Sequence, residues 1–162
     1  GELHRDGRGV RRSAEAAEEH LRRACALDDG RGCDLLGDLL VGRGTGEGRA
    51  GAYDAWRRGC ELDHGPSCTS LAGQLLAGLG VPEAPMAAWR RYEQACGLGD
   101  PAGCGALGFL LLDGRPGVVA ADRPRAERLL RGACRARDAF SCRVLSDRAM
   151  EGPPPAPLAG TR

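Results

Sequence analysis

Eight cysteines are the residues of this chain with the clearest chemical potential, and they form four pairs of one spacing. Seven residues separate the two cysteines of each pair, and the pairs are Cys25/Cys33, Cys60/Cys68, Cys96/Cys104 and Cys134/Cys142. The first cysteines of successive pairs lie 35, 36 and 38 residues apart. A constant spacing within pairs and a near-constant period between them predict a repeat protein with a disulfide framework.

Residues at fixed offsets from the cysteines predict two helices in each repeat. Before the first cysteine, a small residue stands at the first position, a bulky one at the fourth and an alanine at the eighth. This pattern predicts first helices with Ser13 as an N-cap and Pro124 in a first turn, over 13–27, 50–62, 84–98 and 124–136. Leucines and small residues at offsets 3, 4 and 7 after the second cysteine predict a second helix of about ten residues.

These elements predict an all-α protein, an α/α superhelical solenoid of disulfide-stapled helix pairs. The tandem repeats cover residues 1–150, with glycine- and proline-rich turns between the helices. Residues 1–10 match the back half of a second helix and its loop, so the first copy is truncated. The segment EGPPPAPLAGTR, residues 151–162, predicts a disordered proline-rich tail.

The cysteines are expected to be structural disulfides. An antiparallel pair of helices joined by a short turn brings its two cysteines within the ~5.5 Å Cα separation that a disulfide needs. Eight cysteines allow 105 different pairings, and we therefore expect the four pairings within the C-x7-C units. Zinc sites use cysteine pairs separated by two to four residues, and no such pair occurs here. A C-x-x-C-H haem motif is also absent, and the chain has only three histidines, His4, His20 and His64. We therefore predict neither a metal nor a cofactor.

Composition narrows the possible functions. With 23 basic and 22 acidic residues, the net charge of +1 predicts no strong attraction to nucleic acid or membrane. Lysine is absent, which excludes a Walker P-loop, and the glycine run at 42–48 is therefore expected to be a flexible loop. No apolar run reaches the ~18 residues of a membrane span. Paired cysteines favour an extracytoplasmic location, periplasmic or secreted.

The serines give little sign of nucleophilic catalysis. None lies in a G-x-S-x-G elbow, and none has a histidine or lysine beside it in the sequence to act as a base; they are Ser13, Ser67, Ser70, Ser141 and Ser146. A triad assembled from distant residues stays open. No catalytic residue is predicted.

Two sets of residues could contact a partner. Asp38, Gln74 and Phe109 fall near the face of the second helix opposite its leucines, where they would line a groove; the alternative is an ordinary solvated face. Arginines recur three positions before the first cysteine, with Glu93 breaking the column; they are Arg22, Arg57 and Arg131. That column is either an anion-binding ladder or a solvated helix flank, and the flank is the simpler interpretation.

At these offsets the chain resembles the Sel-one-like (Sel1-like) repeat family, a relative of tetratricopeptide repeats. The resemblance rests on GELHRDGRGV with SAEAAEEHLRRAC, on LAGQLLAGLGV with AAWRRYEQAC, and on ALGFLLLDGRPGV with RAERLLRGAC. The cysteines make it similar to the cysteine-rich bacterial branch, typified by Helicobacter cysteine-rich proteins. The slot where that family carries tyrosine holds other residues here, namely His4, Leu40, Leu75 and Leu111.

The resemblance implies a superhelix with a concave groove that binds proteins or peptides. We therefore expect a non-enzymatic extracytoplasmic scaffold with a protein or peptide partner. The alternative, a penicillin-binding protein with weak β-lactamase activity, is implied by the resemblance alone.

Overall fold

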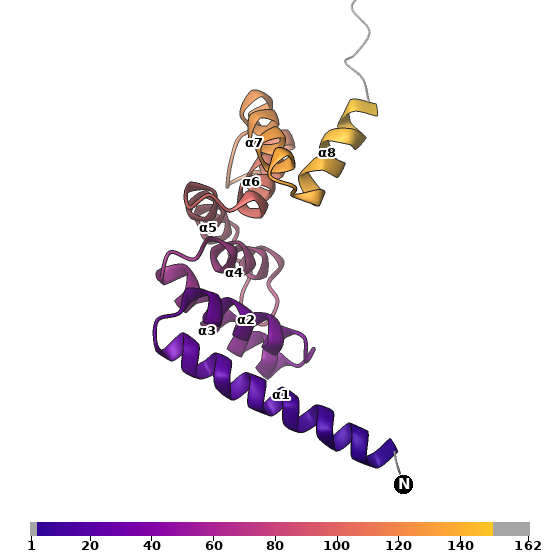
Figure 1. Ribbon diagram of the computed structural model, residues 1–162. Helices are drawn as coiled ribbons and strands as arrows, with labels where there is room; N and C mark the ends of the chain where they lie inside the picture. The colour runs from indigo at the N-terminus through magenta and orange to yellow at the C-terminus, as the bar shows by residue number, and fades with distance from the viewer. Residues whose placement is uncertain (1–2, 151–162) are drawn as a thin grey trace, which may run out of the picture.

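The structure is a computed structural model that describes the backbone of residues 3–150 and the side chains of residues 13–148. Along these residues the elements are helical: α1 (Leu3–Ala26), α2 (Gly30–Val41), α3 (Gly46–Glu61), α4 (Gly65–Ala77), α5 (Pro85–Gly97), α6 (Pro101–Asp113), α7 (Arg123–Arg135) and α8 (Ala139–Met150). Figure 1 shows them stacked in chain order, from α1 at one end to α8 at the other. The predicted all-α solenoid is confirmed, and the predicted tail at 151–162 lies outside the described residues.

Disulfides join each first helix (α1, α3, α5, α7) to the second helix that follows it (α2, α4, α6, α8). The four predicted local pairings are the ones present, with Cα–Cα separations of 4.5, 4.6, 4.4 and 4.7 Å for Cys25–Cys33, Cys60–Cys68, Cys96–Cys104 and Cys134–Cys142. The two ends of each pair are thus held almost in backbone contact.

One backbone turn recurs before every second helix. The third residue after the first cysteine is left-handed, with φ of 63°, 57°, 83° and 70° at Asp28, Asp63, Gly99 and Arg137. The N–H of the next residue then donates to a carbonyl of the first helix, as from Asp29 to Ala24 at 3.1 Å. This αL closure ends the first helix and begins the second within three residues.

Glycines of the turns do less to stop helices than the sequence indicated. Only Gly99 occupies the left-handed position, whereas Gly30 and Gly65 are the first residues of second helices. A Cβ on Gly30 would lie 2.8 Å from the Cβ of His64, and one on Gly65 would lie 2.9 Å from the Cβ of Asp100. These glycines therefore let the turn of one repeat pack directly on the turn of the next.

Bulky side chains of α3 and α7 pack on glycines of the second helix that precedes each of them. A Cβ on Gly37 of α2 would lie 2.6 Å from the Cδ1 of Trp56 of α3, and one on Gly108 would lie 3.0 Å from Leu130. The packing between α2 and α3, α4 and α5, or α6 and α7 is more extensive than that within a disulfide-linked pair. Disulfides fix the helix ends, while the helix faces pack across the longer loops.

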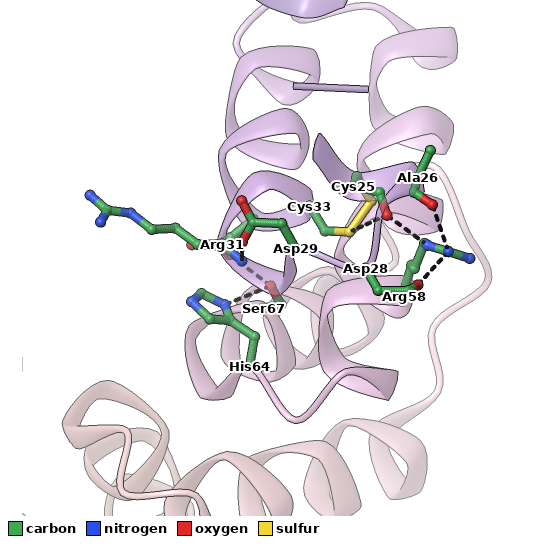
Figure 2. Close-up of a disulfide and its surroundings, with 10 residues drawn as sticks. Cys25, Ala26, Asp28, Asp29, Arg31, Cys33, Arg58, His64 and Ser67 are labelled. Carbon is green, nitrogen blue, oxygen red and sulfur yellow. Dashed lines mark hydrogen bonds and ion pairs between the residues drawn. A yellow bond between two sulfur atoms is a disulfide. The ribbon is translucent and has the colours of Figure 1, made fainter. Parts of the chain in front are cut away.

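In two places, a side chain of one repeat donates a hydrogen bond to the backbone carbonyl of the first cysteine of the preceding repeat. Arg58 donates from Nε to the Cys25 carbonyl at 3.0 Å and from its guanidinium to Asp28 at 2.7 Å, as Figure 2 shows. In the next repeat, the amide of Gln94 donates to the Cys60 carbonyl at 3.2 Å. The end of each of these first helices is thus satisfied by the repeat stacked on it.

The predicted start of the first helix of the chain was wrong. Helix α1 begins at Leu3, so Ser13 lies inside it and is no N-cap, and residues 3–10 extend a first helix instead of forming the end of a second. Among the described elements, α1 packs mainly on α2 and to a smaller extent on α3. The alanine-, glutamate- and arginine-rich stretch after Ser13 favours one continuous helix.

The sequence predicted a flexible loop over residues 42–48, but α3 begins at Gly46, so the loop after α2 is shorter than predicted. The Thr45 hydroxyl accepts a hydrogen bond from the Gly48 N–H at 3.0 Å and caps the helix. A Cβ on Gly48 would collide with the carbonyl of Leu40. Glycine at this position therefore serves close packing of α3 on α2, and no phosphate cradle is formed.

An alanine column marks where the helices approach closely. Ala52, Ala88 and Ala126, eight residues before their cysteines, are all 0% exposed. Ala17 occupies the same slot in α1 and is exposed. Among the described residues, no preceding second helix covers the Ala17 side of α1, whereas such a helix covers the alanines of α3, α5 and α7.

Ala88→Leu should overpack the stack and lower the free energy of unfolding by about 1–3 kcal/mol. The matched control is Ala17→Leu, which places the same side chain in the exposed slot and should change stability by less than about 0.5 kcal/mol. Urea denaturation of the oxidised proteins measures both values. Equal effects of the two substitutions would contradict the close approach at Ala88.

Candidate functional site: the polar edge and exposed face of the second helices

Polar contacts link the N-terminal turns of successive second helices. The Ser67 hydroxyl, 0% exposed, donates to Asp34 Oδ1 at 3.2 Å and lies 3.0 Å from His64 Nδ1. A hydroxyl has one proton, so when Ser67 donates to Asp34 its oxygen accepts from Nδ1–H of His64. Figure 2 shows the His64–Ser67 contact beside the first disulfide.

This trio contains the residue types of a hydrolytic triad in an order that does not activate the serine. In a triad, the histidine lies between the carboxylate and the nucleophile and removes the proton of the hydroxyl. Here Ser67 lies in the middle and is buried, so its oxygen cannot meet a substrate. The trio joins α2 to α4. Sequence analysis missed the contact; the available signal was the three-residue spacing of His64 and Ser67 at the start of a second helix.

The same slots make contacts in the next repeats. Thr69 donates to Asp100, whose Oδ2 also accepts from the Gly103 N–H at 3.0 Å. Further along, Ser141 donates to Asp138, and a Cβ on Gly105 would lie 2.8 Å from that carboxylate. We call this row the polar edge; its residues are Asp34, His64, Ser67, Thr69, Asp100, Asp138 and Ser141.

Asp34 is a half-buried carboxyl of the polar edge. Burial raises the pKa of Asp34 above its ordinary value, and the negative charges of Asp38 and Asp100 raise it further. The Ser67 hydrogen bond and the nearby His64 act in the opposite direction on this pKa. Because the pKa is higher in the folded state than in the unfolded chain, ionised Asp34 opposes folding. This penalty is absent below the unfolded pKa and develops as pH rises through the folded one.

Asp34→Asn should therefore raise Tm at pH 7, by about 1–2 °C, and leave it unchanged at pH 3. The asparagine side chain keeps an oxygen to accept from Ser67, and solvent screening of the half-buried group keeps the gain small. Thermal melts at the two pH values measure it, with the exposed Asp54→Asn as control. A lower Tm at pH 7 for Asp34→Asn would show that the charge itself holds α2 to α4.

Ser67 also fits against the residue beside its own disulfide. A Cβ on Gly59, directly before Cys60, would lie 2.8 Å from the Cβ of Ser67. In two other repeats the sizes are exchanged, because alanine precedes the first cysteine and glycine the second; these pairs are Ala24/Gly32 and Ala95/Gly103. At each of these three crossings one of the two facing residues is glycine. The fourth crossing, Ala133/Ser141, has a side chain on both residues.

Gly59→Ala should cost about 1–3 kcal/mol by overpacking, and Ser67→Gly about 1–2 kcal/mol through its lost hydrogen bonds. The double variant recreates the alanine/glycine arrangement of the neighbouring repeats. It should therefore be more stable than the sum of the single effects predicts, by at least about 1 kcal/mol. Additive effects in a double-mutant cycle of urea midpoints would contradict the size complementarity.

The three predicted groove residues do not share one environment. Asp38 and Phe109, each five residues after a second cysteine, are exposed, and Phe109 is 46% exposed. Gln74 lies six residues after its cysteine, one position further round the helix, and is 4% exposed. Its amide donates to the carbonyls of Arg49 and Leu79, both at 2.7 Å, and so ties the loop after α4 to α3. Partner contact stays a prediction for Asp38 and Phe109.

Sequence analysis missed the partner of Phe109 within the chain. Phe140, at the start of α8, is 40% exposed and lies edge-to-face with Phe109, with ring centroids 5.5 Å apart and an interplanar angle of 68°. The chain has only two phenylalanines, and both lie on this exposed face of the second helices. The rarity of the residue type, together with positions on second helices, was the available signal.

The arginine column is neutralised within its own helices. Arg57 pairs with Glu61 at 2.9 Å, Arg131 with Glu127 at 3.4 Å, and Arg22 with the buried Glu18. Each pair spans one helical turn. Each arginine of the column thus has a carboxylate partner one helical turn away, which favours the helix-flank interpretation over a continuous anion-binding ladder along the repeats.

Within residues 13–148 no group of three or more histidine, cysteine or acidic side chains has the arrangement to hold a metal ion. None of the described helices has the length and apolar character to cross a membrane.

Comparison with known proteins places this geometry among repeat proteins. Helicobacter pylori cysteine rich protein B is similar over 83% of this chain and 96% of its own length, with 27% identity and a TM-score of 0.64. A Sel1 repeat protein from Oxalobacter formigenes is similar over 80% of this chain and 53% of its own, with 20% identity and a TM-score of 0.71.

A third solved structure is a protective antigen present in uropathogenic Escherichia coli strains, which displays an SLR fold. It is similar over 87% of this chain and 30% of its own, with 21% identity and a TM-score of 0.74. Neither a family model nor a curated protein matches the chain. The resemblance to cysteine-rich Sel1-like repeat proteins is confirmed by the solved structures.

Proposed function

We propose that this helical repeat protein is a non-enzymatic scaffold that binds a protein or peptide through the exposed face of its second helices. The observation that carries the proposal is the Phe109–Phe140 pair. Both residues stay at least 40% exposed although their rings touch each other, and aromatic side chains are common anchors of protein interfaces. Asp38 lies on the same face of α2 and would supply a polar contact.

The repeat architecture supports a partner that contacts several repeats. Helix pairs in a solenoid present equivalent positions at regular intervals, so a partner gains affinity from many modest contacts. Phe109 belongs to the third disulfide-linked pair and Phe140 to the fourth, so the aromatic contact already bridges two repeats. A partner seated on these rings would therefore sense the angle between repeats.

The proposal includes an extracytoplasmic location, periplasmic or secreted. All eight cysteines are in disulfides, and such bonds persist where the environment is oxidising. The similarity to Helicobacter pylori cysteine rich protein B supports the same location. The β-lactamase alternative has no added support from the site, because Ser67 is buried and donates its proton to Asp34.

The test is partner capture from the native envelope fraction by crosslinking, with mass spectrometry and then measurement of affinity for the captured protein. Phe109→Ala/Phe140→Ala should weaken binding at least tenfold, since such aromatic anchors often carry 1.4 kcal/mol or more of binding energy. Leu79→Ala is the matched control, since Leu79 is 45% exposed in a loop away from the pair, and it should bind like the wild type.

Equal binding by the three proteins would contradict the role of the aromatic face. Melting curves establish that the double variant keeps its fold, because two exposed rings contribute little to stability. A parallel nitrocefin assay on oxidised, metal-free protein addresses the alternative. If the protein hydrolyses nitrocefin and a single substitution on this face abolishes the hydrolysis, the protein is an enzyme and the scaffold proposal is wrong.

A further inference from the structure

Helix α7 carries the strongest charge imbalance of the described helices. It contains five arginines and one glutamate, whereas α3 contains three arginines and three acidic residues. The whole chain has a net charge of only +1, so the positive charge is concentrated in this helix. Such a local excess is what attracts an oppositely charged partner.

Four of these arginines share one face of α7. Arg125, Arg128, Arg131 and Arg135 are spaced by three, three and four residues, which places them along one side of the helix. The opposite side is buried and packs on α6 and α8 through Ala126, Leu130 and Ala133. Arg128, Arg131 and Arg135 are exposed, and the Arg125 side chain is 43% exposed. We call these four residues the arginine face.

Carboxylates of the chain neutralise only part of the arginine face. Arg125 lies 3.6 Å from Glu93 of α5, and Arg131 lies 3.4 Å from Glu127. Both are exposed pairs, which bind weakly. Within the described residues, Arg128 and Arg135 have no carboxylate within 4 Å. Two positive side chains are thus available to a partner, and two more are held by weak contacts.

Helix stability does not account for this arrangement. Arginines three and four residues apart repel one another along the face. Arg123 and Arg125 occupy the first turn of α7, where the positive end of the helix dipole disfavours cations, although the Asp122 carboxylate caps this end by accepting from the Arg125 N–H. Of the four arginines of this face, Arg131, one turn after Glu127, and Arg135, in the last turn, are favourably placed for the helix. Side chains that break the local rule without a gain in packing mark a functional surface.

We propose that the arginine face binds an acidic peptide segment of a partner protein. Neighbouring arginines on a helix face have Cβ atoms about 5–6 Å apart, close to the ~7 Å between alternate side chains of an extended peptide. Guanidinium groups hold carboxylates through paired hydrogen bonds. Glu93 and Glu127 flank the face and oppose a uniformly anionic polymer, whereas a peptide can present neutral residues to them.

This surface is separate from the aromatic face of the proposed function. It lies on a first helix, whereas Phe109 and Phe140 lie on second helices. The two surfaces can therefore be tested independently.

The probe is a fluorescent peptide of alternating Glu and Ser with four glutamates, followed by anisotropy at about 20 and about 300 mM NaCl. Arg128→Glu/Arg135→Glu should weaken binding at least tenfold at low salt. Arg31→Glu/Arg57→Glu is the control, since either pair of reversals shifts the net charge by −4, from +1 to −3. The control should stay within about twofold of wild type, and salt should weaken the wild-type interaction.

Three outcomes would overturn the proposal. They are no binding at the lower salt concentration, equal losses in the two double variants, and tighter binding of heparin than of the peptide through the same arginines. The last outcome would identify a sulfated polysaccharide as the ligand. Melting curves control for folding, and Phe109→Ala/Phe140→Ala should bind the peptide normally, which keeps this test distinct from that of the aromatic face.

Discussion

The disulfide crossing between each first helix and the following second helix constrains most of this structure. Sulfur–sulfur bonds hold the two backbones 4.4–4.7 Å apart at Cα, so little space is left for the residues beside the cysteines. One crossing has glycine facing serine, at Gly59/Ser67, and two have alanine facing glycine. At these three crossings a Cβ on the glycine would lie within 2.8 Å of the side chain opposite. The fourth crossing, Ala133/Ser141, holds a side chain on both residues at a Cα–Cα separation of 4.7 Å.

Stacking of the repeats follows from the same close approach. The turn that the disulfide closes lies directly on the turn of the next repeat, with Gly30 against His64 and Gly65 against Asp100. The polar edge and the capping of first-helix carbonyls, as by Arg58, then connect neighbouring repeats through hydrogen bonds. Stability in such an array is a sum of units and their interfaces, so each disulfide supports the neighbours as well as its own pair.

The two proposed surfaces use the two kinds of helix for different purposes. Second helices present the aromatic pair, where burial of apolar surface would supply affinity and the angle between two repeats would matter. The arginine face lies on a first helix, where charge would steer an acidic segment and salt would weaken it. A rigid stack can keep both surfaces at a fixed distance and orientation. Disulfide bonds within each helix pair contribute to that rigidity.

The cysteine spacing by itself determined the pairing, the helix order and the repeat, because a fixed offset in a helix translates directly into a fixed place on its surface. The alanine column and the bulky residues facing glycine followed from the same offsets. Tertiary structure decided what depends on the neighbouring repeat. One position of difference turned Gln74 inward while Phe109 stayed exposed, and Ser67 met Asp34 from a helix 33 residues away. Contacts of this kind join residues far apart in the chain, and no local pattern encodes them.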